Sequence, residues 1–182
     1  MDIKEKEKIK GEYTMVSLSP KVKKGSKFLG KLRIALGENN IAFLEEMKKA
    51  GLILSIRKAT NLIPTVGRSV FARIMIGDTT YSGEIDYGAL GNGVSPVFTN
   101  ASTQLTAEVY RFQAASQSRD ANIVYIDWFI NSGDVADQTF TEFAAFIDGT
   151  AAANSGQAWS LLATGGWVKS GSMYISAKYT LL

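Results

Sequence analysis

The chain has 182 residues, 46% of them hydrophobic, so it can bury a core as one domain with an extension. It contains no cysteine and no histidine, which excludes disulfide frameworks, thiolate metal sites and histidine-based acid–base catalysis. The net charge of +3 combines two unlike parts: residues 1–60 carry 14 basic and 7 acidic residues, net +7, and residues 61–182 carry 6 and 10, net −4. This asymmetry predicts that the N-terminal part contacts something other than solvent.

Residues 1–37 are predicted to form an extended basic arm. Residues 1–10 alternate Lys and Glu, which fits an exposed helical segment or a frayed end, and no acidic residue occurs from Tyr13 to Gly37. Pro20, Gly25 and Gly30 argue against a long helix across the first half of that stretch. We expect the arm to bind partners through its basic and apolar residues Lys21, Lys23, Lys24, Lys27, Phe28, Leu29, Lys31 and Arg33.

Residues 38–60 are predicted to form a connector with one helix and one strand. Asn39 or Asn40 can cap a helix that runs to about Ala50, and alternation from Leu52 predicts a strand. A second helix is predicted from Pro64 to Ile76, because proline suits a first helical turn and Gly77 can end the helix. Its expected buried stripe is Ile63, Val66, Val70 and Ile74.

Residues 61–182 are predicted to form an antiparallel β-sandwich, which makes the chain mainly β with some α. Several apolar or alternating runs are separated by turn residues, as in sandwich domains. The last run should be paired, since a free apolar edge would aggregate, and Gly165–Gly166 should form a turn. The expected strands are Tyr81–Leu90, Ala107–Ser116, Asn122–Ile130 (a central strand), Thr139–Ile147, Gln157–Ala163 and Ser172–Leu182.

The stretch from Tyr87 to Arg111 contains a glycine-rich break, GALGNG, followed by a predicted helical turn at Ser102–Glu108. The glycines resemble a phosphate-binding loop only superficially, because no Lys-Ser/Thr follows and no helix is directly attached. The break is therefore interpreted as a sharp turn. No metal or cofactor is expected anywhere in the chain.

Two sets of carboxylates are candidates for chemistry. Glu84 and Asp86 lie two residues apart and could serve as an acid–base pair or bind calcium, although a solvated strand face is the simpler interpretation. Asp127 stands in the apolar run NIVYIDWFI, so it should be buried and paired, with Arg73 or Arg111 as candidate partners.

Four segments carry a resemblance to the N-terminal domain family of bacteriophage tail-collar fibre proteins: TVGRSVFARIMIG, EIDYGALGNG, TQLTAEVYR and FTEFAAFIDGT. The family often has Val-Gly-Asp-Gly where this chain has Ala89–Gly93, and its members continue into a long fibre. The resemblance implies a β-rich virion protein without catalytic activity, a docking or connecting component of the tail, baseplate or fibre attachment site. It also implies synthesis in the cytoplasm of the bacterial host and assembly with other virion proteins and copies of itself, without a membrane.

Other functions remain open. A capsid decoration or head-fibre protein would share the same features. A carbohydrate-binding module could use Trp128, Trp159 or Trp167, of which Trp167 is expected to be exposed beside its two glycines. A glycan hydrolase could use Glu84 and Asp86. Nucleic acid could bind the basic arm, but no nucleic-acid-binding motif occurs in the sequence, which favours a protein partner.

Overall fold

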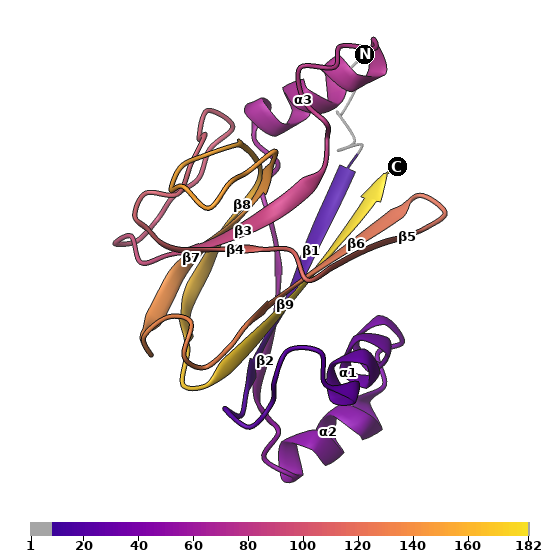
Figure 1. Ribbon diagram of the computed structural model, residues 1–182, viewed down its shortest axis with the longest axis vertical. Helices are drawn as coiled ribbons and strands as arrows, with labels where there is room; N and C mark the ends of the chain where they lie inside the picture. The colour runs from indigo at the N-terminus through magenta and orange to yellow at the C-terminus, as the bar shows by residue number, and fades with distance from the viewer. Residues whose placement is uncertain (1–8, 182) are drawn as a thin grey trace, which may run out of the picture.

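Two antiparallel sheets pack face to face in the computed structural model, which describes residues 9–181 (Figure 1). The five-stranded sheet has the order β2 (Ile53–Thr60), β1 (Ile9–Leu18), β9 (Ser172–Leu181), β6 (Ile123–Ile130) and β5 (Ser116–Asp120). The four-stranded sheet has the order β4 (Glu108–Gln113), β3 (Ile85–Gly91), β7 (Thr139–Ile147) and β8 (Gln157–Val168). This arrangement confirms the predicted mainly-β sandwich, including the pairing of the last strand, which lies between β1 and β6.

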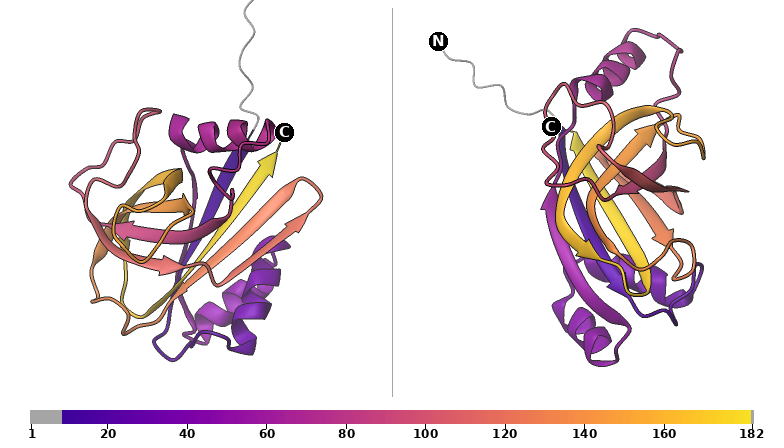
Figure 2. Two further views of the ribbon diagram at one scale, coloured as in Figure 1. Left: turned by 45° about the horizontal axis from the view of Figure 1, so that its top comes forward. Right: turned by 90° about the vertical axis from the view of Figure 1, so that its left-hand side faces the viewer.

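Three helices surround the sandwich. α1 (Lys27–Gly37) and α2 (Ile41–Lys49) pack on the outer face of the five-stranded sheet, and α3 (Thr65–Met75) lies at the opposite end of the molecule (Figures 1 and 2). The predicted α2 cap is confirmed, because Asn40 Oδ1 accepts a hydrogen bond from the Phe43 N–H at 3.1 Å. α3 begins after Pro64 as predicted, and its Gly67 passes so close to β8 that a Cβ would lie 2.8 Å from the Ala158 carbonyl oxygen.

β1 is buried on both faces over its last four residues, Met15–Leu18. Tyr13 and Met15 point into the core between the sheets, whereas Val16 and Leu18 point toward the helices. The core between the sheets is rich in aromatic rings, and Phe143 meets both Tyr13 and Trp128 edge-on. β1 is thus shared by two hydrophobic clusters.

The prediction that residues 1–37 form an arm outside the sandwich is wrong for the described part of that range. β1 pairs with β9 along Ile9–Leu18 and with β2 on its other edge, so it is an interior strand. The predicted connector is likewise part of the fold, because β2 extends the same sheet. Residues 1–8, and the expectation of a helical or frayed segment there, lie outside the described residues. The charge pattern suggests an arm because β1 and the lysine-rich sequence that directly follows it fall in the same basic N-terminal range.

Local details also differ from the expectations. Residues 102–107 form bends and irregular backbone, not a helical turn. β5 is a separate strand that the alternation did not distinguish from its neighbour. β8 continues through Gly165 and Gly166, both at positive φ, where β7 and β8 shift register. Ile74 of the expected buried stripe is 40% exposed, whereas Val70 is 1% exposed.

Candidate docking surface and the buried polar clusters

The lysine-rich segment is a loop and helix fixed on the body of the protein. The chain leaves β1 at Leu18, turns through Gly25 at positive φ, and enters α1 after Ser26. The inner face of α1 packs on the five-stranded sheet through Leu32 and Ala35, which are buried, and through partly buried neighbours. The apolar spacing of three and four residues along α1 thus explains why it forms an amphipathic helix despite Gly30.

The five lysines of the predicted docking set are exposed, and their side chains have no partner among the described residues. Lys21, Lys23 and Lys24 lie in the loop, and Lys27 and Lys31 lie on α1. None of the five forms an ion pair or a side-chain hydrogen bond within residues 9–181. Elsewhere lysines do find partners, as Lys48 does with Glu45 at 2.7 Å. The segment therefore presents uncompensated positive charge to solvent.

Phe28 and Leu29, which were also expected to bind partners, belong instead to the fold. Both are partly buried in the cluster between α1, α2 and the sheet. The Phe28 ring stacks on Phe43 of α2, with ring centroids 6.4 Å apart and planes 28° apart. These two residues hold the helices together, so they position the lysines.

Arg33 is directed toward the sheet. Its Nε lies 3.2 Å from Asp127 Oδ2, and its guanidinium also donates to the Ser118 hydroxyl. Asp127 is buried as predicted, at 3% exposure, and also accepts a hydrogen bond from Ser116 at 2.8 Å. The predicted partners were wrong: Arg73 pairs with Asp78, and Arg111 pairs with Glu108. Burial, followed by the nearby Asp127 charge, raises the pKa of Tyr174, so its hydroxyl stays protonated.

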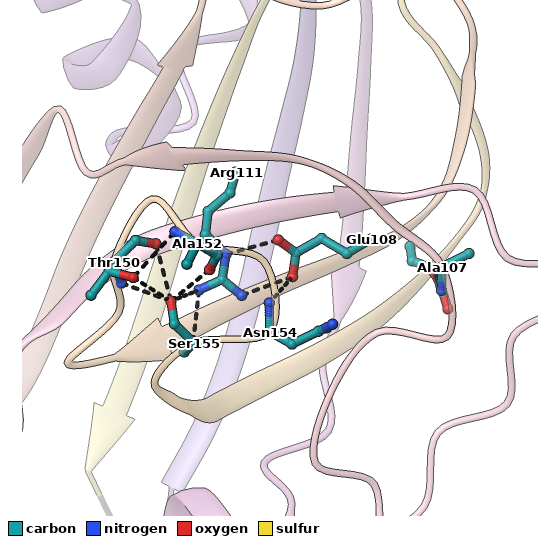
Figure 3. Close-up of polar contacts among 8 residues, drawn as sticks. Ala107, Glu108, Arg111, Thr150, Ala152, Asn154 and Ser155 are labelled. Atoms are coloured by element: carbon teal, nitrogen blue, oxygen red, sulfur yellow. Dashed lines mark hydrogen bonds and ion pairs between the residues drawn. The ribbon is translucent and has the colours of Figure 1, made fainter.

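Arg111, the last residue of the EVYR segment, fastens a loop to the edge of the four-stranded sheet. Its guanidinium forms two hydrogen bonds of 2.8 Å to the Glu108 carboxylate and donates to the Ser155 carbonyl at 2.7 Å (Figure 3). The guanidinium carbon lies 4.1 Å from the centroid of the Phe146 ring. The Arg111 and Glu108 side chains are 3% and 4% exposed. This closed cluster stabilises the turn after β7 and presents no open site.

The Glu142 carboxylate lies against the backbone of the glycine-rich segment, which accounts for two of its glycines. Its side chain is fully buried and accepts hydrogen bonds from the N–H groups of Thr106 and Ala107, both at 3.0 Å. A Cβ at Gly91 would collide with Glu142 Oε2, and one at Gly93 would collide with the Thr106 hydroxyl. The glycines thus let the backbone pass close to a buried carboxylate, and they leave no cradle for a phosphate. The prediction of a sharp turn at the glycine break is wrong, because Gly88 and Gly91 lie within β3 and neither they nor Gly93 have positive φ.

Glu84 and Asp86 do not share a strand face as expected, since β3 begins at Ile85. Glu84 is exposed, whereas Asp86 is partly buried and accepts a hydrogen bond from Gly149 N–H at 2.8 Å. Burial raises the pKa of Asp86, and the charges of Asp148 and Glu84 raise it further. Within residues 9–181 no group of three or more acidic side chains is arranged to hold a metal ion.

The three tryptophans are buried, at 0% exposure for Trp128, 5% for Trp159 and 1% for Trp167. The prediction of an exposed Trp167 is wrong, because β8 carries it back into the core, where its indole N–H donates to Ser17 Oγ at 2.8 Å. None of them offers a ring face to a sugar.

An apolar groove of about 430 Å³ opens beneath α3, between the start of β3 and the β5–β6 hairpin. No sequence pattern pointed to it, because its walls come from α3 and six strands that are spread along the sequence. It is lined chiefly by Phe71, Ile74, Ile85, Val124, Trp159 and Tyr179, with Glu84 and Arg119 among its polar residues.

Comparison with known proteins found no protein-family model, no curated protein and no solved structure that matches this chain. None of the helices within residues 9–181 is long and apolar enough to cross a membrane.

Proposed function

We propose that the protein is a bacteriophage virion structural protein, a docking or connecting component of the tail, baseplate or fibre attachment site. The proposal depends on one observation: five exposed lysines, held on a fixed loop and helix, have no side-chain partner within residues 9–181. The resemblance of GALGNG and EVYR to tail-collar fibre proteins gives the virion context. A partner surface rich in carboxylates fits these lysines.

The fold suits docking because the charged segment is preorganised. α1 is anchored by its buried face and by the Arg33–Asp127 ion pair, so binding a neighbour does not require the helix to be ordered first. The lysines then contribute to the rate and register of association, and the rigid sandwich supplies a fixed shape.

The test is to reverse charge on the docking surface and follow incorporation into particles. Lys23→Glu, Lys27→Glu and Lys31→Glu together should leave the fold intact, because all three side chains are exposed, and should abolish incorporation. A matched control reverses Lys48, Lys49 and Lys58, which are exposed on α2 and β2 at the same end of the molecule. Normal incorporation of the first variant would contradict the proposal, whereas cross-linking of wild-type protein in purified particles would separate a tail from a capsid location.

Two functions of other classes have less support. A carbohydrate-binding module needs exposed aromatic faces, and all three tryptophans are buried. A glycan hydrolase needs two carboxyls in distinct roles, and here only Glu84 of the pair lines the apolar groove, whereas Asp86 is partly buried and accepts a hydrogen bond from Gly149 N–H. Release of reducing sugar by the wild type, lost in Glu84→Gln with Asp86→Asn, would favour the hydrolase.

A further inference from the structure

The groove beneath α3 combines an apolar floor with a carboxylate in its lining and two more carboxylates nearby. Phe71 and Ile74 of α3 are 36% and 40% exposed, and both line it. Glu84 lines it too, and the charges of Glu84 and Asp148 both act on Asp86. None of the three carboxylates takes part in an ion pair within the described residues. Arg119, on the β5–β6 hairpin, is the positive residue that also lines the groove.

The outer face of α1 has the opposite charge and a complementary apolar side chain. Lys27, Gly30, Lys31 and Ile34 are spaced by three and four residues, so they share the solvent face of the helix. Ile34 is 59% exposed although it is large and apolar, and a Cβ at Gly30 would meet nothing within 4 Å. This face therefore presents one projecting apolar side chain, Ile34, beside Lys27 and Lys31. Gly30 adds no side chain to it.

We propose that the groove beneath α3 binds the outer face of α1 from a second copy of this chain. Ile34 of one copy enters the apolar groove of the next, and Lys27 and Lys31 pair with Glu84, which lines the groove, and with Asp148, which directly follows the lining residue Ile147. This inference rests on the proposed function, since it names one partner of the lysine surface. The second copy is favoured because the same chain carries both halves of the charge complementarity and both exposed apolar elements.

The positions of the two surfaces determine the kind of assembly. α1 and α3 lie at opposite ends of the molecule in every view (Figures 1 and 2). Contact between different surfaces of successive copies is heterologous, so it leads to a closed ring or to an open chain. Pairing with lysine would also relieve the mutual repulsion of Glu84, Asp86 and Asp148.

Sedimentation velocity of the purified full chain, followed over a concentration series, tests the proposal. The wild type should form oligomers that dissociate as salt rises from about 0.05 to about 0.5 M, because screening weakens exposed ion pairs. Glu84→Lys, Lys31→Glu and Ile34→Asp should each weaken association by about tenfold or more. Ile41→Asp is the matched control for Ile34→Asp, because Ile41 is 56% exposed at the start of α2, outside the proposed contact.

Mixing the charge-reversed variants provides the sharper comparison. A Glu84→Lys chain and a Lys31→Glu chain each repel their own kind at the proposed contact, but together they restore opposite charges at both contacts. The mixture should therefore assemble more strongly than either variant alone. A monomeric wild type, or oligomers unaffected by Glu84→Lys and Ile34→Asp, would overturn the inference. Lysine-dependent incorporation into particles by a monomeric protein would leave the proposed function standing and assign the lysines to another virion protein.

Discussion

Arg33 and Asp127 form an ion pair whose two members differ greatly in burial. The Arg33 side chain is 39% exposed and that of Asp127 is 5% exposed. Removing Asp127 leaves an arginine that can turn toward water, whereas removing Arg33 leaves a buried carboxylate that keeps the hydrogen bond from the Ser116 hydroxyl but loses its counter-ion. Substituting Arg33, the more exposed residue, should therefore lower the free energy of unfolding more than substituting Asp127 does.

We expect Arg33→Ala to lower the free energy of unfolding by about 3 kcal/mol, because a buried charge loses its partner. Asp127→Asn should cost about 1 kcal/mol, since the amide keeps its size and can still accept from Ser116. Urea denaturation at neutral pH measures both, and the double variant should lose less than the sum. Losses that add fully in the double variant would mean that the two residues do not act through their ion pair.

The burial of Asp127 could be predicted from sequence, but its partner could not. A carboxylate inside NIVYIDWFI must be buried on one face or the other, and periodicity alone indicates this. The partner depends on which element covers that face. The prediction of a free arm places Arg33 away from the sandwich, so it assigns Arg33 to partner binding and leaves arginines of residues 61–182 as the candidate counter-ions.

Among larger elements, the loop from Asn92 to Ala107 owes its conformation to one residue of another strand. Glu142 on β7 accepts hydrogen bonds from the Thr106 and Ala107 N–H groups, and Thr141 donates from its hydroxyl to the Gly93 carbonyl at 2.7 Å. These bonds replace the backbone pairing that a strand or helix would provide. The glycine pattern predicts a sharp turn, which is wrong, and nothing near it in sequence indicates the carboxylate that the loop encloses.

Glu142→Ala should therefore release this loop and destabilise the protein by about 3 kcal/mol or more, because several buried N–H groups lose their acceptor. Amide hydrogen exchange should rise from Asn92 to Ala107 and stay unchanged in β9. Ser160→Ala provides a control for a buried polar deletion in β8, remote from the loop. Unchanged exchange in the loop of a folded Glu142→Ala protein would contradict this explanation.

At the scale of the whole molecule, the five-stranded sheet places the first and last strands of the described chain, β1 and β9, side by side. β1 pairs with β9 over the full length of both strands, and β2 pairs with β1 on its other edge. The alternation in β9 predicted a paired strand, yet it could not identify β1 as the partner. Pairing between strands this distant in sequence leaves no local signal, and the lysines after Leu18 suggested an extension.

This topology determines what removal of the first 37 residues should do. The deletion takes away β1 and α1, exposing one edge of β9 and the apolar residues beneath the helices, among them Phe129 and Tyr174. We expect the truncated chain to be insoluble or to lack a cooperative thermal transition, because a central strand cannot be lost from a sheet buried on both faces. The matched control keeps the strand and reverses Lys23, Lys27 and Lys31, and should melt within a few degrees of the wild type. A truncated chain that still unfolds cooperatively would show that β9 can be paired or covered in another way, and that residues 9–37 are an addition to the sandwich, not a part of it.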